Sequence, residues 1–163
     1  PYHRGYAYRD YGNRVGIWRL LNLFNEFNFP CAILVNGSVY EKCPEILVPW
    51  RDRGDEFVGH GRTNSERQAE MSYEEEKSMF EDVNRIYLAN EGKIPKGWLG
   101  PFISQSPKTP ELLIDNGYKY MLDWWFDDQP LWSKKSSTTE GFSRISSSFR
   151  RDTTRIGEIL SQT

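Results

Sequence analysis

The sequence is poor in cysteine and histidine and contains no long apolar run. Two cysteines, Cys31 and Cys43, are too few for a disulfide scaffold. With no CxxC motif and only two histidines, His3 and His60, a structural zinc site is not expected. The longest apolar runs, such as residues 31–35, are far shorter than the roughly 20 residues that span a bilayer. We therefore expect neither a disulfide scaffold nor a transmembrane protein, and no membrane partner.

Length and composition limit the class of protein. At 163 residues the chain is long enough for one ordinary domain. It is too short for a complete (β/α)₈ barrel, which needs about 250 residues. Only 37% of the residues are hydrophobic, but an aromatic share of 15% argues against wholesale disorder. The net charge of −2 combines −5 up to Ser133 with +3 from Lys134 onward. Because the main body is acidic, we expect no nucleic-acid partner.

Hydrophobic periodicity predicts alternating helices and strands. Apolar residues between 13 and 28 recur every three or four positions, which predicts an amphipathic helix. Residues 1–14 show no period and are expected to be irregular. Further helices are predicted at 38–53, 73–90 and 109–116, and short strands at 31–35, 56–59, 96–99 and 118–126. This alternation is typical of βα units around a parallel sheet.

The helix boundaries carry their own signals. Ser38 is a candidate N-cap for the helix 38–53, which Pro44 is expected to enter or break. Ser72 with Glu75 forms a capping box before the helix 73–90, and Gly92 is expected to end that helix.

Polar and glycine-rich loops follow the predicted strands. In a parallel sheet these loops meet at the edge formed by the carboxyl ends of the strands, where α/β proteins collect their functional groups. The loops contain Asn36-Gly37-Ser38, residues 60–64, Gly100-Pro101-Phe102 and Asp127-Asp128-Gln129-Pro130. We therefore expect the site at this edge.

His60 is the first candidate in these loops, because its imidazole lies between two glycines at a strand end. It suits a general acid, a substrate hydrogen-bond partner or a metal ligand, or else a histidine satisfied by neighbouring backbone groups. Asn64, four residues later, carries an amide, which is a poor zinc ligand. Asp127 and Asp128, preceded by Asp123, supply a base or a cation site, or form a solvated loop or helix cap.

Two tryptophans and the C-terminal segment complete the candidates. Trp98 and Trp124 either wall a pocket or pack in the core. Residues 133–163 hold eight serines and five threonines and few aromatics, which predicts a flexible tail. The expected organisation is therefore a domain over residues 1–132 followed by this tail.

Several segments together resemble the polysaccharide deacetylase family (carbohydrate esterase 4, NodB-like), and most closely its allantoinase-like branch. They are RDYGNRVG at 9–16, NGS at 36–38, GHGRTNS at 59–65, KGWLGP at 96–101, and DW at 123–124 with DDQP at 127–130. The resemblance covers about residues 9–132 in order. It implies an α/β fold, a partial (β/α)₇-type deacetylase barrel with parallel strands that lacks the family's first and last strands.

The resemblance also implies hydrolysis of a carbon–nitrogen bond outside peptides, in an N-acetyl sugar or in the ring amide of a ureide such as allantoin. The usual family pattern holds a divalent metal with an aspartate and two histidines. His60 matches the first histidine, and Asn64 stands where the second is expected. This departure fits the allantoinase-like branch and argues against zinc, so we expect no metal and no other cofactor.

The resulting hypothesis assigns roles to seven residues. The catalytic candidates are His60, Asp127 and Asp128, and the substrate-binding candidates are Asn36, Asn64, Trp98 and Trp124. The rival hypothesis is a non-catalytic ligand-binding or scaffold protein that keeps a degenerate deacetylase pocket. A half barrel has open sheet edges, so we expect a homo-oligomer. The expected compartment is the cytoplasm.

Overall fold

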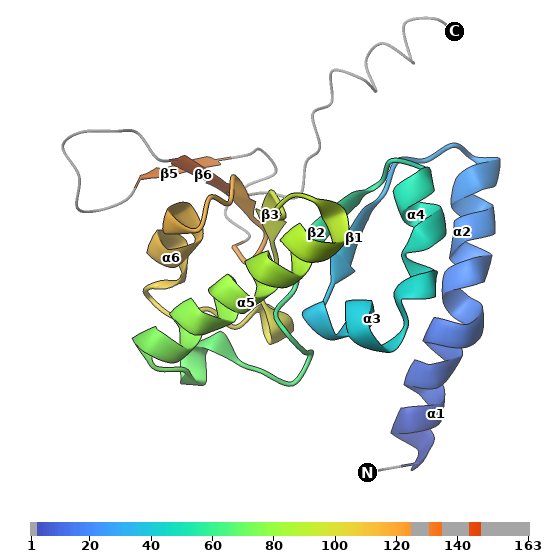
Figure 1. Ribbon diagram of the computed structural model, residues 1–163, viewed down its shortest axis with the longest axis horizontal. Coiled ribbons are helices and arrows are strands. Elements are labelled where there is room, and N and C mark those ends of the chain that lie inside the picture. Colours follow the sequence, from blue (N-terminus) through green and yellow to red (C-terminus); the bar gives the residue numbers. More distant parts are fainter. Residues whose placement is uncertain (1–2, 125–130, 135–143, 148–163) are drawn as a thin grey trace, which may run out of the picture.

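Four parallel strands form the central part of the fold in the computed structural model, which describes residues 3–124, 131–134 and 144–147. These strands are β1 (Ala32–Val35), β2 (Glu56–Gly59), β3 (Gly97–Trp98) and β4 (Tyr120–Met121), and they lie side by side in chain order. All three pairings between them are parallel. Helical segments make each crossover between neighbouring strands (Figure 1). The predicted α/β fold with parallel strands is confirmed.

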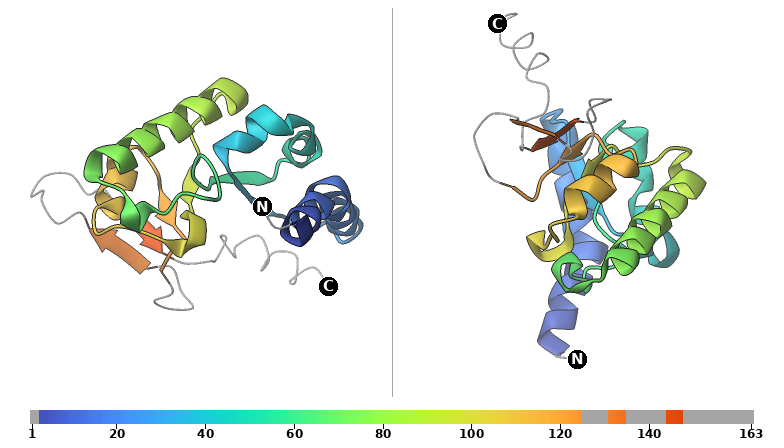
Figure 2. Two further views of the ribbon diagram at one scale, coloured as in Figure 1. Left: turned by 90° about the horizontal axis from the view of Figure 1, so that it is seen from below. Right: turned by 90° about the vertical axis from the view of Figure 1, so that its left-hand side faces the viewer.

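The N-terminal segment is helical from its third residue. Helix α1 (His3–Tyr11) continues through a π-helical turn (Gly12–Gly16) into α2 (Ile17–Glu26). The expectation of an irregular segment is therefore wrong for residues 3–11, where a helix forms although it buries no residue. Figure 2 shows α1 extending away from the sheet. The amphipathic helix predicted for residues 13–28 is confirmed in α2, which packs against α4 (Val48–Asp52) through the Phe24 and Trp50 rings, 5.9 Å apart.

Prolines divide the next crossover into three pieces. Helix α3 (Gly37–Lys42) is followed by a 3₁₀ turn (Pro44–Ile46) and then by α4. The break expected at Pro44 is therefore confirmed. The expected cap is wrong: Asn36, not Ser38, is the N-cap residue of α3, and it makes no side-chain cap.

Helix α5 (Tyr73–Glu91) supplies most of the core. Its predicted capping box is present: the Ser72 hydroxyl accepts from the Glu75 amide at 3.3 Å, and the Glu75 carboxylate accepts from the Ser72 amide at 2.8 Å. Gly92 ends the helix with φ 68°, a left-handed conformation that glycine adopts without steric cost. Its inward residues Met79, Phe80, Val83 and Tyr87 are buried and pack against β3, β4 and α6 (Thr109–Asp115).

Two further strands involve the Ser/Thr-rich segment: β6 lies within it, and β5 crosses its first residues. Strand β6 (Arg144–Ser147) pairs with β4 in parallel, and β5 (Leu131–Lys134) pairs with β6 in antiparallel fashion. Within the segment predicted as a flexible tail, residues 133–134 and 144–147 therefore lie in strands, and the flexibility of the tail stays a prediction. The division into residues 1–132 and 133–163 stays a prediction.

No helix among the described residues is both long and apolar enough to cross a membrane.

Candidate functional site at the carboxyl edge of the sheet

The loops that follow β1 and β2 are joined by three hydrogen bonds. The Asn36 side-chain amide donates to the His60 carbonyl oxygen. The backbone amides of Gly37 and Ser38 donate to the carbonyl oxygens of Gly61 and Arg62, both at 2.9 Å. The prediction that these two loops meet at one edge of the sheet is therefore confirmed. The side-chain amide of Asn36 therefore helps to hold the loop that carries His60.

His60 is half-buried and oriented by the next strand along. Its Nδ1 lies 2.5 Å from the carbonyl oxygen of Leu99, the residue directly after β3. A carbonyl oxygen only accepts hydrogen bonds, so Nδ1 carries the proton and donates. In the neutral ring this leaves Nε2 as an acceptor. No hydrogen bond to Nε2 occurs within residues 3–124.

Asp123 lies two residues beyond β4 and is buried, with 5% of its surface exposed. Its Oδ1 accepts from the backbone amide of Gly100 at 2.9 Å. Its Oδ2 is buried and has no hydrogen-bond partner among the described residues. Burial raises the pKa of this carboxyl to about 6, and the bond from Gly100 opposes the rise. A carboxyl with such a pKa can exchange protons near neutral pH.

Asp123 has no role of its own in the sequence analysis: it is part of the DW motif at 123–124 and precedes Asp127 and Asp128. The signal that distinguishes it is position, because Asp123 is among the first residues after a strand, as His60 is. Asp127 and Asp128 lie outside the described residues, so their predicted roles remain predictions.

Trp98 belongs to the core. None of its surface is exposed, and its ring packs against Phe80 at 4.6 Å and Tyr118 at 5.6 Å between centroids. The prediction that Trp98 contacts a substrate is therefore not supported, because the ring is covered on the side where α5 packs. Its indole Nε1 donates to Gln68 Oε1 at 3.1 Å.

A buried polar network continues from Gln68. Its Nε2 donates to Glu76 at 2.9 Å, and Glu76 also accepts from the hydroxyls of Ser106, at 2.5 Å, and Thr109. Glu76 is 1% exposed, and three neutral donors satisfy its carboxylate. The network therefore fixes Gln68 beside Gly100, where an added Cβ would lie 2.5 Å from Gln68 Oε1.

Trp124 and Asn64 occupy different surroundings. Trp124 is half-buried against the core, and its indole Nε1 donates to Gln105 at 2.7 Å when the Gln105 amide is oriented to present its oxygen. Asn64 is exposed in the turn that follows His60. Both lie at the edge that carries His60, and their predicted substrate contacts stay predictions.

The described residues contain no cluster of three or more His, Cys, Asp or Glu side chains that could hold a metal ion. His60 has no second imidazole beside it in the loop 59–65, since Asn64 occupies that position.

A cavity of about 430 Å³ opens at this edge between α3 and α5. Ser38, Thr63 and Arg62 line it from the two joined loops. Arg62 donates to Glu66 at 2.6 Å and to Asp82 at 3.0 Å, and these carboxylates raise its pKa. The cavity wall therefore carries a neutralised guanidinium.

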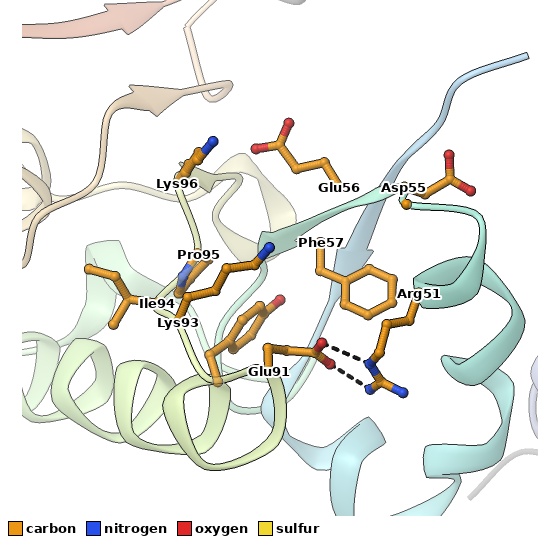
Figure 3. A pocket seen from close by; sticks show the side chains of 11 residues that line it. Arg51, Asp55, Glu56, Phe57, Glu91, Lys93, Ile94, Pro95 and Lys96 are labelled. Carbon is orange, nitrogen blue, oxygen red and sulfur yellow. Dashed lines mark hydrogen bonds and ion pairs between the residues drawn. The ribbon is translucent and has the colours of Figure 1, made fainter.

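A second cavity, of about 350 Å³, lies at the opposite edge, where β2 and β3 begin (Figure 3). Arg51 of α4 bonds the Glu91 carboxylate with two hydrogen bonds of 2.6 and 2.8 Å, which join α4 to the end of α5. Lys93 and Lys96 line this cavity and are exposed. The cavity is separated from His60 by the length of the strands.

The sheet is built from parallel βα units, and a histidine and a buried carboxyl lie at the carboxyl ends of its strands. These features define a protein of the α/β-barrel class, and this chain forms part of a barrel. The pattern of the family described as "Polysaccharide deacetylase" matches residues 8–121. The chain belongs to the polysaccharide deacetylase family, which confirms the resemblance drawn from the sequence motifs.

Individual relatives agree with this assignment. The chain is 32% identical over 110 residues to a peptidoglycan deacetylase of Helicobacter pylori, a match that covers 68% of this chain and 37% of the relative. The crystal structure of PuuE allantoinase superposes with a TM-score of 0.74 and 27% identity, covering 88% of this chain and 46% of that one. A probable polysaccharide deacetylase from Pseudomonas aeruginosa PAO1 superposes with a TM-score of 0.73 and 30% identity, covering 88% and 47%. The chain thus spans less than half the length of these relatives.

Proposed function

We propose that this chain is part of a hydrolase that cleaves carbon–nitrogen bonds outside peptides. The observation that carries the proposal is His60, whose Nδ1 is held by the Leu99 carbonyl so that Nε2 is left as an acceptor at the edge where functional groups collect. Membership in the polysaccharide deacetylase family supports the same chemistry.

Amide hydrolysis assigns His60 two proton transfers. Nε2 takes a proton from water as the water oxygen bonds to the amide carbon, which leaves a tetrahedral oxyanion. His60 then returns the proton to the nitrogen as the carbon–nitrogen bond breaks, giving a carboxylic acid and an amine. Asp127 and Asp128 assist with charge, Trp124 borders the substrate, and Asn64 hydrogen-bonds it.

For the substrate we propose the ring amide of a ureide such as allantoin, with an N-acetyl sugar as the alternative. Support for the ureide comes from the likeness to PuuE allantoinase and from Asn64 at the position of the second family histidine. Support for the sugar comes from the likeness to a peptidoglycan deacetylase.

The test measures hydrolysis of allantoin and of an N-acetylglucosamine oligomer, each with and without a chelator. We expect ureide hydrolysis that survives chelation and that falls by about 100-fold or more in His60→Gln, the loss typical of a missing acid–base group. His3→Gln is the matched control, because His3 is exposed on α1. Activity abolished by the chelator would contradict the metal-independent reading, and activity unaffected by His60→Gln would contradict the proposal itself.

The second candidate is a non-catalytic binding protein with a degenerate pocket. The replacement of a family histidine by Asn64 favours it, since this change removes chemistry and leaves a hydrogen-bonding side chain. Calorimetry with allantoin or the sugar oligomer distinguishes the two, because saturable heat without turnover would support the binding protein.

We also propose a homo-oligomer. Among the described strands β1 has a partner on one side only, and Leu34 on this strand is 42% exposed. Leu20, Leu23 and Phe27 form a second apolar surface on α2 and are 50%, 46% and 54% exposed. Light scattering is expected to show an oligomer that Leu23→Glu dissociates, while Glu26→Gln, on the same helix, leaves its mass unchanged. A monomer at all concentrations would refute this proposal.

For the compartment we propose the cytoplasm, on the support of the small number of cysteines. Two cysteines in 163 residues are too few for the disulfide scaffold typical of small secreted domains. Fractionation of cells with an antibody to the chain tests this assignment, and recovery outside the cytoplasm would overturn it.

A further inference from the structure

A single peptide group is held at both of its polar ends by side chains of the candidate site. The carbonyl of the Leu99–Gly100 peptide accepts from His60 Nδ1 at 2.5 Å. The amide of the same peptide donates to Asp123 Oδ1 at 2.9 Å. These bonds form a continuous chain from imidazole through peptide to carboxyl, which links the loops after β2, β3 and β4.

We propose that Asp123 is a positioning residue for His60 and acts through the Leu99–Gly100 peptide. An ionised carboxylate that accepts an amide proton polarises the peptide and makes its carbonyl oxygen a stronger acceptor. That oxygen in turn holds the proton on Nδ1 of His60 and fixes the ring plane. Nε2 therefore stays unprotonated, and its lone pair points in a fixed direction.

The surroundings of Asp123 are those of a functional carboxyl. A buried carboxylate without a cation or a second donor is costly, so packing alone does not favour it. Among the described residues no cation forms an ion pair with Asp123. Arg62, two residues after His60, forms its ion pairs with Glu66 and Asp82 instead. Gln68, which lies beside Gly100, is neutral, and it separates this carboxyl from that of Glu76.

Gly100 makes the contact possible. Its φ of −66° and ψ of 141° suit any residue, so glycine is not required by the backbone. An added Cβ would instead lie 2.5 Å from Gln68 Oε1 and 2.8 Å from Asp123 Oδ1. Gly100→Ala therefore separates the peptide from Asp123 while both His60 and Asp123 remain in the chain.

The proposal rests on the proposed function of His60, but its main test does not need activity. The imidazole ¹⁵N resonances of the full chain are compared in the wild type and in Asp123→Asn at pH 8.5, where the Asp123 carboxyl is ionised. His3, exposed on α1, serves as the internal reference. Asparagine keeps an oxygen for the Gly100 amide, removes the charge and replaces Oδ2 by an NH2 group.

We expect the wild-type His60 to show one protonated and one unprotonated ring nitrogen, with Nδ1 protonated. In Asp123→Asn and in Gly100→Ala the two resonances should approach those of His3, and exchange of the Nδ1 proton with solvent should become about twofold faster or more. The controls Asp52→Asn and Gly12→Ala make the same chemical changes at an exposed aspartate and at an open helical glycine, and should change neither signal.

A wild-type measurement covers the case in which a variant fails to fold. The Gly100 amide proton and the Asp123 carboxyl ¹³C resonance should titrate together near pH 6. Separate titrations, or His60 resonances that are the same in the wild type and in folded Asp123→Asn, would overturn the proposal. If the wild type turns over no substrate, the proposed function fails while these spectra still decide the role of Asp123.

Discussion

Replacing Asp123 by asparagine should stabilise the protein in a pH-dependent way. In the folded chain burial raises the pKa of Asp123 from 3.8 to about 6. Between these two values the folded protein holds a proton that the unfolded chain has released. The free energy of unfolding of the wild type should therefore fall as pH rises through this window.

The size of the effect follows from the pKa difference. A shift of about two pKa units corresponds to about 3 kcal/mol of stability, present in full below about pH 4 and lost above about pH 6. Asparagine cannot ionise and escapes this loss. The asparagine NH2 group occupies the position of the protonated Oδ2, which has no hydrogen-bond partner among the described residues. The wild type and Asp123→Asn should therefore be about equally stable at pH 4.

The assay is denaturant unfolding of both proteins at several pH values from 4 to 7.5. We expect the stability difference to grow by about 2.5 kcal/mol between pH 4 and 7.5 in favour of Asp123→Asn, with most of the change between pH 4.5 and 6.5. For Asp52→Asn, at an exposed position, the curve of unfolding free energy against pH should stay parallel to that of the wild type. Parallel curves for Asp123→Asn would refute the reasoning, because they would show that Asp123 has the same pKa in the folded and unfolded chains.

Three further changes test the packing that supports the site. Tyr87→Phe removes a buried hydroxyl that donates to two strand carbonyls, at 2.9 and 3.1 Å, and should lower the unfolding free energy by about 1–3 kcal/mol in denaturant melts; no change would contradict the inferred bonds. Ser72→Ala removes the capping box of α5 and should cost about 1 kcal/mol by the same measurement, whereas Ser72→Thr should cost much less. Gly97→Ala places a Cβ 2.1 Å from the Tyr120 ring, so it should lower the melting temperature by several degrees, and the double variant with Tyr120→Ala should recover much of that loss.

Local signals predicted most of the secondary structure. The capping box at Ser72, the left-handed Gly92 and the break at Pro44 depend on a few neighbouring residues, so they are visible without any tertiary contact. The N-terminal helix shows the limit of such signals. Residues 3–11 have no apolar stripe, and they form a helix that continues directly into α2.

The position of His60 was also determined by the sequence, because a polar loop after a buried strand must lie at the carboxyl edge of a parallel sheet. Only the tertiary structure decided which groups meet it there. Trp98 is a core ring because α5 covers it, and sequence alone leaves core and pocket wall equally open for a tryptophan. The link from His60 to Asp123 runs through a backbone peptide, and no side-chain pattern reveals which backbone group two distant loops will share.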